Sequence, residues 1–103
     1  MGLDVAIDEL YATGWDGSDE SDCDRYDDGR CFPVVQRAVR EASELGFDLE
    51  IRHIQLFNCY RAEWQDPAGA SGAVVGQTES ETAVYALSQL RRGTGTPAEP
   101  AGV

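Results

Sequence analysis

The spacing of apolar residues along the chain predicts three helices. In residues 4–12 they recur every three or four positions, with acidic residues between them, which is typical of a short amphipathic helix. A second helix is expected to open at Pro33, because proline suits a first helical turn, and to stop at Gly46. The capping-box sequence Thr78–Glu81 predicts the start of a third helix, which ends at Gly93.

The second predicted helix has the clearest apolar stripe. Its polar residues are expected to face solvent, and Arg37 and Glu41 form a potential i,i+4 ion pair on that polar side. The stripe itself comprises Val34, Val35, Ala38, Val39, Ala42 and Leu45.

Residues 47–64 alternate between apolar and polar positions, which indicates β structure. The alternation changes phase near Arg52 and His53, where no glycine or proline favours a turn. We therefore expect one long bent strand, with two strands joined by a tight turn as the alternative. Residues 66–72 have the composition of a turn, and residues 73–77 return as a strand.

These elements predict a small α+β fold, in which an antiparallel sheet of two or three strands packs against two or three helices. The order is helix, acidic loop, helix, strand, strand, helix. We expect a single domain over residues 1–92, which includes the acidic loop 16–30, and a flexible tail over residues 93–103. So small a sheet has exposed edges, and a homodimer through a sheet edge is a reasonable expectation.

The last predicted strand and helix, AVVGQTESETAVYALSQL, resemble the closing element of double-stranded-RNA-binding domains. The second half of the chain also has the element order of that family. The resemblance implies a shared topology. It implies no RNA binding, because Glu79 and Glu81 stand where the family places basic residues at the start of its last helix.

Charge is concentrated in the segment from Asp16 to Arg30, which fits neither a helix nor a strand pattern. Trp15 and Phe32 at its ends indicate that it is anchored in an apolar core. The chain has a net charge of −11, which disfavours nucleic acids and anionic membranes as partners. With no apolar run long enough to span a bilayer and no secretory signal, we expect a cytoplasmic protein. Because all eight basic residues are arginine, genome composition or salt adaptation is an alternative explanation for the acidity.

The first functional hypothesis is a small, non-catalytic regulatory or adaptor protein that binds a basic protein surface through residues 16–28. Clustered carboxylates attract a cationic partner, and this attraction weakens as salt is added. The expected contact residues are Asp19, Glu20, Asp22, Asp24, Asp27 and Asp28, with Trp15 and Tyr26 as aromatic anchors.

The second hypothesis is a metal-binding or redox-responsive module that uses Cys23 and Cys31 with His53 or Cys59. These residues match zinc by type, but no C-x-x-C pair supplies two thiolates from one turn. The acidic residues could instead attract calcium, although they do not match an EF-hand loop. A third hypothesis is a small-molecule-binding protein or enzyme with a pocket between the sheet and the acidic loop. No nucleophile or phosphate-loop motif supports catalysis.

Overall fold

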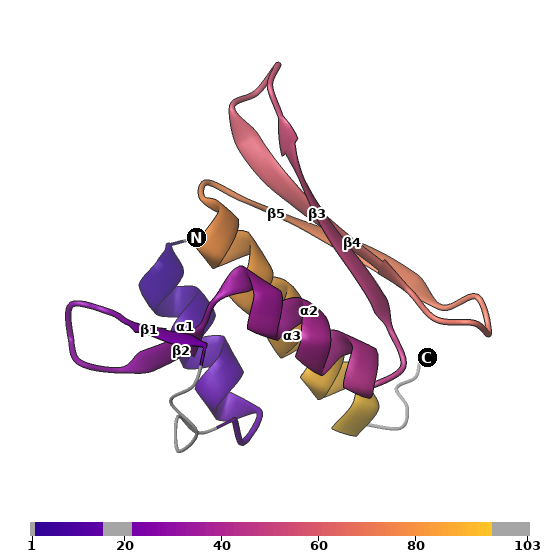
Figure 1. The fold of residues 1–103 in the computed structure, drawn as a ribbon, viewed down its shortest axis with the longest axis horizontal. Coiled ribbons are helices and arrows are strands. Elements are labelled where there is room, and N and C mark those ends of the chain that lie inside the picture. The colour runs from indigo at the N-terminus through magenta and orange to yellow at the C-terminus, as the bar shows by residue number, and fades with distance from the viewer. Residues whose placement is uncertain (1, 16–21, 96–103) are drawn as a thin grey trace.

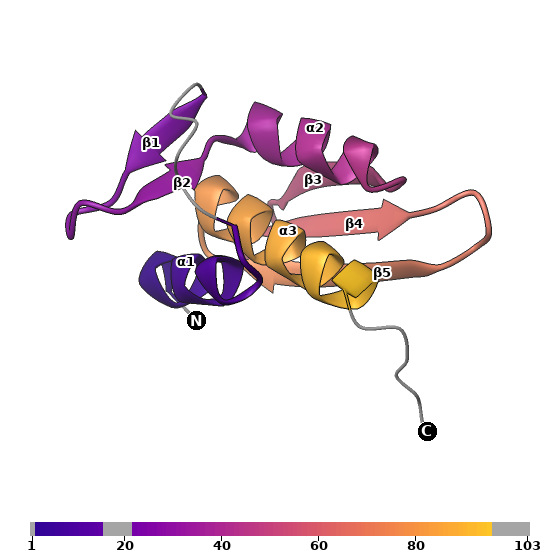
Figure 2. The ribbon, with the colours of Figure 1, turned by 90° about the horizontal axis from the view of Figure 1, so that it is seen from below.

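The computed structural model describes residues 2–15 and 22–95, with side chains through Arg92. It shows a small α+β fold in three layers (Figures 1 and 2). The elements are α1 (Leu3–Ala12), β1 (Cys23–Arg25), β2 (Cys31–Pro33), α2 (Val35–Glu44), β3 (Asp48–Ile54), β4 (Cys59–Gln65), β5 (Ser71–Gly76) and α3 (Glu79–Gly95). Helices α2 and α3 form the middle layer, the three-stranded sheet covers one side of it, and α1 lies with the β1–β2 hairpin on the other.

All strand pairs in the two sheets are antiparallel. In the larger sheet the order is β3-β4-β5, so β4 is central and the other two strands are edges. Ile51 pairs with Ala62, and Ala62 pairs with Val74, which places these three residues on the face that the helices cover. The opposite face carries charged residues of β3 and β4. The α2-β3-β4-β5-α3 order agrees with the topology expected for the second half of the chain.

Helix α2 begins two residues later than predicted, because Pro33 belongs to β2 and is buried there. Val34 is the N-cap and has extended backbone. The C-terminus is as predicted. Gly46 has φ +93°, and the N–H groups of Gly46 and Phe47 donate to the carbonyls of Ser43 and Ala42, both at 2.9 Å. This is the Schellman arrangement, in which glycine tolerates the left-handed conformation.

The preferred expectation of one bent strand over residues 47–64 is wrong, and the two-strand alternative is correct. The turn occupies residues 55–58, a few residues after the change of phase. The N–H groups of Phe57 and Asn58 donate to the carbonyls of Ile54 and Gln55. Asn58 adopts φ +48°, a left-handed conformation that asparagine tolerates better than most residues. Asn58 was therefore the turn signal in a segment without glycine or proline.

Helix α3 starts at the predicted capping box. The Glu81 N–H donates to Thr78 Oγ1 at 3.1 Å, while the Glu81 carboxylate accepts from the Gln77 N–H at 3.4 Å. The return bond therefore reaches one residue further back than in the standard motif. The helix continues to Gly95, two residues past the predicted end. The rest of the predicted tail, residues 96–103, lies outside the described residues.

The core consists of two clusters on opposite sides of α3. One joins α1, β2 and α3 through residues such as Ile7, Phe32 and Leu87. The other joins α2, α3 and the sheet, and includes Leu49 and Ala62. Alanines on α2 and α3 are fully buried, which lets the helices approach closely. Because α1 and β2 both contribute residues to the first cluster, the first helix and the β1–β2 hairpin form one packed unit with the body of the fold.

Candidate functional site

The second half of the acidic segment belongs to a β-hairpin over residues 22–33, which we call the acidic hairpin. This corrects the expectation of an irregular loop. Strands β1 and β2 pair from Cys23–Pro33 to Arg25–Cys31. At the turn, the Tyr26 N–H donates to the Arg30 carbonyl at 2.8 Å, and Gly29 has φ +92°. Each strand has only three residues, too few for a visible period-2 pattern. The hairpin projects from the α1 side of the molecule (Figure 1).

Aromatic residues hold this hairpin against the core, as their positions beside the acidic segment predicted. Trp15 and Phe32 are each only 5% exposed. Tyr26 is half-buried against the core cluster that joins α1, β2 and α3. The Tyr11 hydroxyl donates to the Cys31 carbonyl at 2.8 Å. The Trp15 side chain therefore lies inside the protein, and it anchors the segment from within.

The described carboxylates of the hairpin fall into two groups. Asp22 binds Arg40 at 3.1 Å, and Asp28 binds the Arg30 side chain at 2.7 Å. The Arg30 backbone N–H also donates to Asp28, and this hydrogen bond is the main cause that lowers the pKa of Asp28. Asp24 and Asp27 are exposed and have no ion-pair partner among the described residues. Asp19 and Glu20, also expected contacts, lie outside the described residues.

A polar cluster centred on a buried arginine joins the segment after α1, the β1–β2 hairpin and α2. Arg37, only 8% exposed, donates from Nε to Glu41 Oε2 at 2.6 Å and from Nη1 to Cys23 Sγ at 2.9 Å. Its guanidinium also lies 5.2 Å from the centre of the Trp15 ring system. Trp15 Nε1 donates to the Glu41 carboxylate at 3.1 Å. We call Trp15, Cys23, Arg37 and Glu41 the Arg37 cluster.

The burial of Arg37 corrects the expectation that it faces solvent with the other polar residues of the helix. In the sequence nothing distinguishes it from Arg40, one turn further on, which remains exposed. The difference arises because Trp15 and Cys23 pack over one part of α2 only. The Arg37 cluster is therefore a feature that sequence reasoning missed.

The cluster gives Cys23 a specific chemical environment. Arg37 Nη1 lies 2.9 Å from Cys23 Sγ, and a cationic neighbour of this kind is typical of reactive cysteines. Cys23 and Cys31 are diagonal neighbours on one face of the hairpin, because they pair with Pro33 and Arg25. Diagonal Cβ atoms lie about 7 Å apart, whereas a disulfide needs about 4 Å. Joining these two cysteines in a disulfide therefore requires the short hairpin to shift.

The residues considered for a metal site are divided between two hairpins. Cys23 and Cys31 lie on β1 and β2, whereas His53 and Cys59 lie on β3 and β4, beyond the helical layer (Figure 1). His53 instead stacks on Tyr60 with ring centroids 4.9 Å apart. Over residues 2–15 and 22–92, no three His, Cys, Asp or Glu side chains gather into a group that could hold a metal ion.

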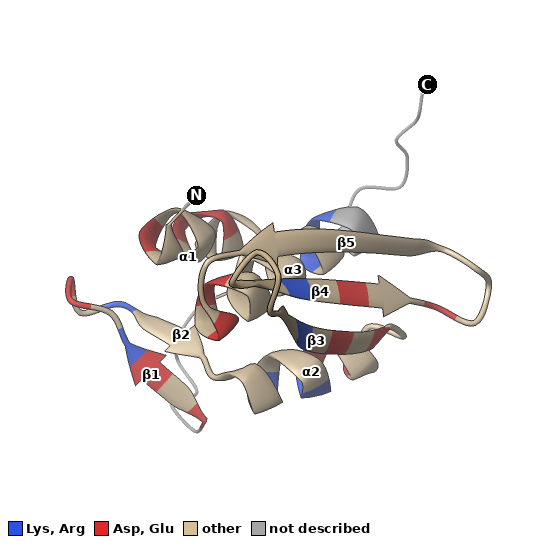
Figure 3. Cartoon of the chain, turned by 90° about the horizontal axis from the view of Figure 1, so that it is seen from above, with Lys and Arg blue, Asp and Glu red and all other residues tan. Residues whose placement is uncertain are grey.

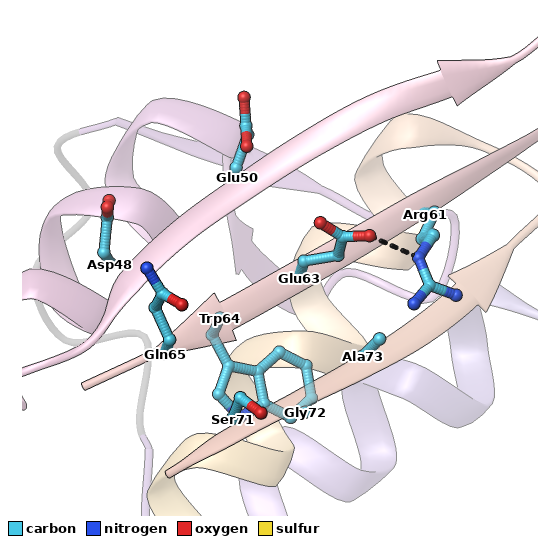
Figure 4. A pocket seen from close by; sticks show the side chains of 9 residues that line it. All are labelled: Asp48, Glu50, Arg61, Glu63, Trp64, Gln65, Ser71, Gly72 and Ala73. Carbon is cyan, nitrogen blue, oxygen red and sulfur yellow. Dashed lines mark hydrogen bonds and ion pairs between the residues drawn. The ribbon is translucent and has the colours of Figure 1, made fainter. Parts of the chain in front are cut away.

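The open face of the sheet is hollowed by about 420 Å³ at one end (Figure 4). Asp48, Glu50 and Glu63 line this hollow, and Arg61 donates to Glu63 at 2.6 Å. That hydrogen bond is the main cause that lowers the pKa of Glu63. Another hollow lies between the end of α2 and the β4–β5 turn. The described linings of both contain neither cysteine nor histidine, and neither includes a residue of the acidic hairpin.

None of the described helices combines the length and the apolar composition needed to cross a bilayer. Comparison of the chain with models of protein families, with curated proteins and with solved structures finds no match.

Proposed function

We propose that this chain is a non-catalytic adaptor of the cytoplasm, which binds a basic protein surface through its acidic hairpin. The observation that carries the proposal is the state of Asp24 and Asp27. Both are exposed, Asp24 on β1 and Asp27 in the turn, whereas the paired strand β2 is buried. Neither has an ion-pair partner among the described residues. Their charge is therefore available to a partner, whereas Asp22 and Asp28 are already engaged with arginines.

The fixed position of the acidic hairpin on the body of the protein supports this function. The Arg37 cluster and the buried residues of β2 fix the base of the hairpin, so little conformational entropy is lost when a partner binds. Unpaired surface carboxylates contribute mainly to the rate and selectivity of association with a cationic surface. Asp24 and Asp27 are the main proposed contacts among the described residues, and Asp19 and Glu20, which lie outside them, are further proposed contacts.

The test measures binding of a short oligo-arginine peptide to the full chain by calorimetry. We expect the double variant Asp24→Asn/Asp27→Asn to lose roughly threefold or more in affinity, because two unneutralised charges near the peptide disappear. The matched control Glu44→Gln/Asp48→Asn removes the same total charge from exposed positions outside the hairpin, and should change affinity much less. Binding should also weaken severalfold between about 0.05 M and about 0.3 M NaCl. Equal losses in the two double variants would contradict the proposal.

A second candidate function is a thiol switch at Cys23, favoured by the 2.9 Å contact with Arg37. A peroxide would oxidise the Cys23 thiolate to a sulfenic acid and be reduced to water with uptake of a proton. Condensation with the Cys31 thiol would then release a second water molecule and form a disulfide. The geometry requires the hairpin to move in that step, which would alter how Asp24 is presented.

Cys59 provides an internal control for this second function, because it is half-exposed like Cys23 but belongs to the other hairpin. We expect Cys23 to react with a thiol-alkylating reagent several times faster than Cys59 near neutral pH, because Arg37 favours its thiolate. Peptide mass spectrometry of a time course measures both rates in one sample. If Cys23 reacts no faster than Cys59, and peroxide forms no Cys23–Cys31 disulfide, the switch is ruled out.

A further inference from the structure

We propose that two copies of this chain pair through the β5 edge and form one continuous six-stranded antiparallel sheet. Strand β5 is an edge of the larger sheet and pairs with β4 along its length. From Tyr60–Gly76 to Gln65–Ser71 the pairing has no interruption, so no bulge bends this edge away. An uninterrupted edge presents backbone N–H and C=O groups that another strand can bind.

The charge pattern distinguishes β5 from the other edge (Figure 3). Strand β3 carries Asp48, Glu50 and Arg52, and edge charges of this kind discourage pairing with another chain. Strand β5 contains no charged residue and no proline. It lies within the longest uncharged stretch of the sequence, residues 67–78, in a chain of which 26% is charged. The usual protection of an edge strand is therefore missing at β5.

A second copy is the partner that best fits this edge. Two chains that each carry a net charge of −11 repel each other, and they can approach most closely where neither has charge. The nearest charged side chains on β4 compensate one another, because Arg61 opposite Val75 binds Glu63 opposite Ala73 at 2.6 Å. The contact therefore joins an uncharged strand to its copy, and the neighbouring strand β4 of each chain carries a balanced pair of charges.

The alternation of side chains indicates a register. If Val74 lies opposite Val74 of the second copy, then Val75 lies opposite Ala73 of that copy on the open face. Val75 is 53% exposed, and this pairing would cover it with another apolar side chain. The alternative register centred on Ala73 would place Val75 opposite Ser71 instead. The first register therefore gives the larger apolar contact.

The test follows the mass of the full chain by analytical ultracentrifugation over a range of concentrations. We expect the wild-type chain to shift from monomer toward dimer as concentration rises. Val75→Lys should weaken the dimer roughly tenfold or more, because the ammonium would lie against apolar Ala73 of the second copy and beside Arg61. The control Leu56→Lys adds the same charge at the β3–β4 turn, where Leu56 is 84% exposed, and should associate like the wild type.

Hydrogen exchange of the wild-type chain gives a readout that needs no variant. Amides of β5 should exchange more slowly at high concentration than at low concentration, while amides of β3 should not change. A wild-type chain that remains monomeric at all concentrations would overturn the proposal. So would association that Val75→Lys leaves intact, or concentration-dependent protection that appears at β3 instead of β5.

Discussion

The variant Arg37→Ala is expected to lose roughly 3 kcal/mol of its free energy of unfolding. The substitution removes the partner of the largely buried Glu41 carboxylate, and breaking a buried ion pair from one side costs about 3–5 kcal/mol. The low end applies because Glu41 keeps its hydrogen bond from Trp15 Nε1. Urea unfolding, followed by circular dichroism and tryptophan fluorescence, measures the change.

Arg40→Ala is the matched control, because Arg40 lies one turn further along α2 and pairs with Asp22 in solvent. Exposed pairs contribute only about 0–1 kcal/mol, so this variant should unfold close to the wild type. The double variant Arg37→Met/Glu41→Met should recover part of the loss, since it removes both charges of the Arg37–Glu41 pair together. If Arg37→Ala and Arg40→Ala had the same small effect, the Arg37 cluster would not be a stabilising anchor of the hairpin.

The variant Gly76→Ala is expected to lose roughly 1–3 kcal/mol, the usual cost of overpacking a buried site. Gly76 is buried where β5 passes the first turn of α3. A Cβ atom there would lie 2.5 Å from Thr82 Oγ1 and 3.2 Å from the Thr82 backbone nitrogen. Thr82 Oγ1 cannot move away freely, because it donates to the Thr78 carbonyl at 2.7 Å. Thermal and urea unfolding would both show the loss.

A double-mutant cycle identifies the cause of that loss. Thr82→Ala removes the atom that lies closest to the added Cβ, so Gly76→Ala should cost much less in the Thr82→Ala background than in the wild type. Additive effects of the two substitutions would show that contact with Thr82 is not the cause of the stability lost in Gly76→Ala.

The helices and their ends follow from local sequence to a large extent. The second helix stops at Gly46 and the third opens at Thr78–Glu81, because capping depends on a few neighbouring residues. The start of the second helix was misplaced, since Pro33 suits a first helical turn and the end of a short strand equally well. The β3–β4 turn is expected from sequence only as the alternative to one bent strand, because Asn58 is a weaker turn signal than glycine.

The candidate sites depended more on tertiary structure. Sequence showed an acidic segment with apolar ends, but not which of its carboxylates are engaged by arginines. Arg30 follows Asp28 closely, whereas Arg40 reaches Asp22 only because α2 packs beside the hairpin. Residue type alone groups Cys23 and Cys31 with His53 and Cys59, and the fold separates the two pairs.

The sequence by itself determined the α+β class, the capped helices, the acidic segment and the uncharged stretch that became β5, because these depend on composition and on contacts between near neighbours. Tertiary structure alone decided that Arg37 is buried while Arg40 is not, and that β5 is an edge while β4 is central. Burial and strand order are set by segments distant in sequence, such as Trp15 packing on α2, and no local pattern records which distant segment will pack there.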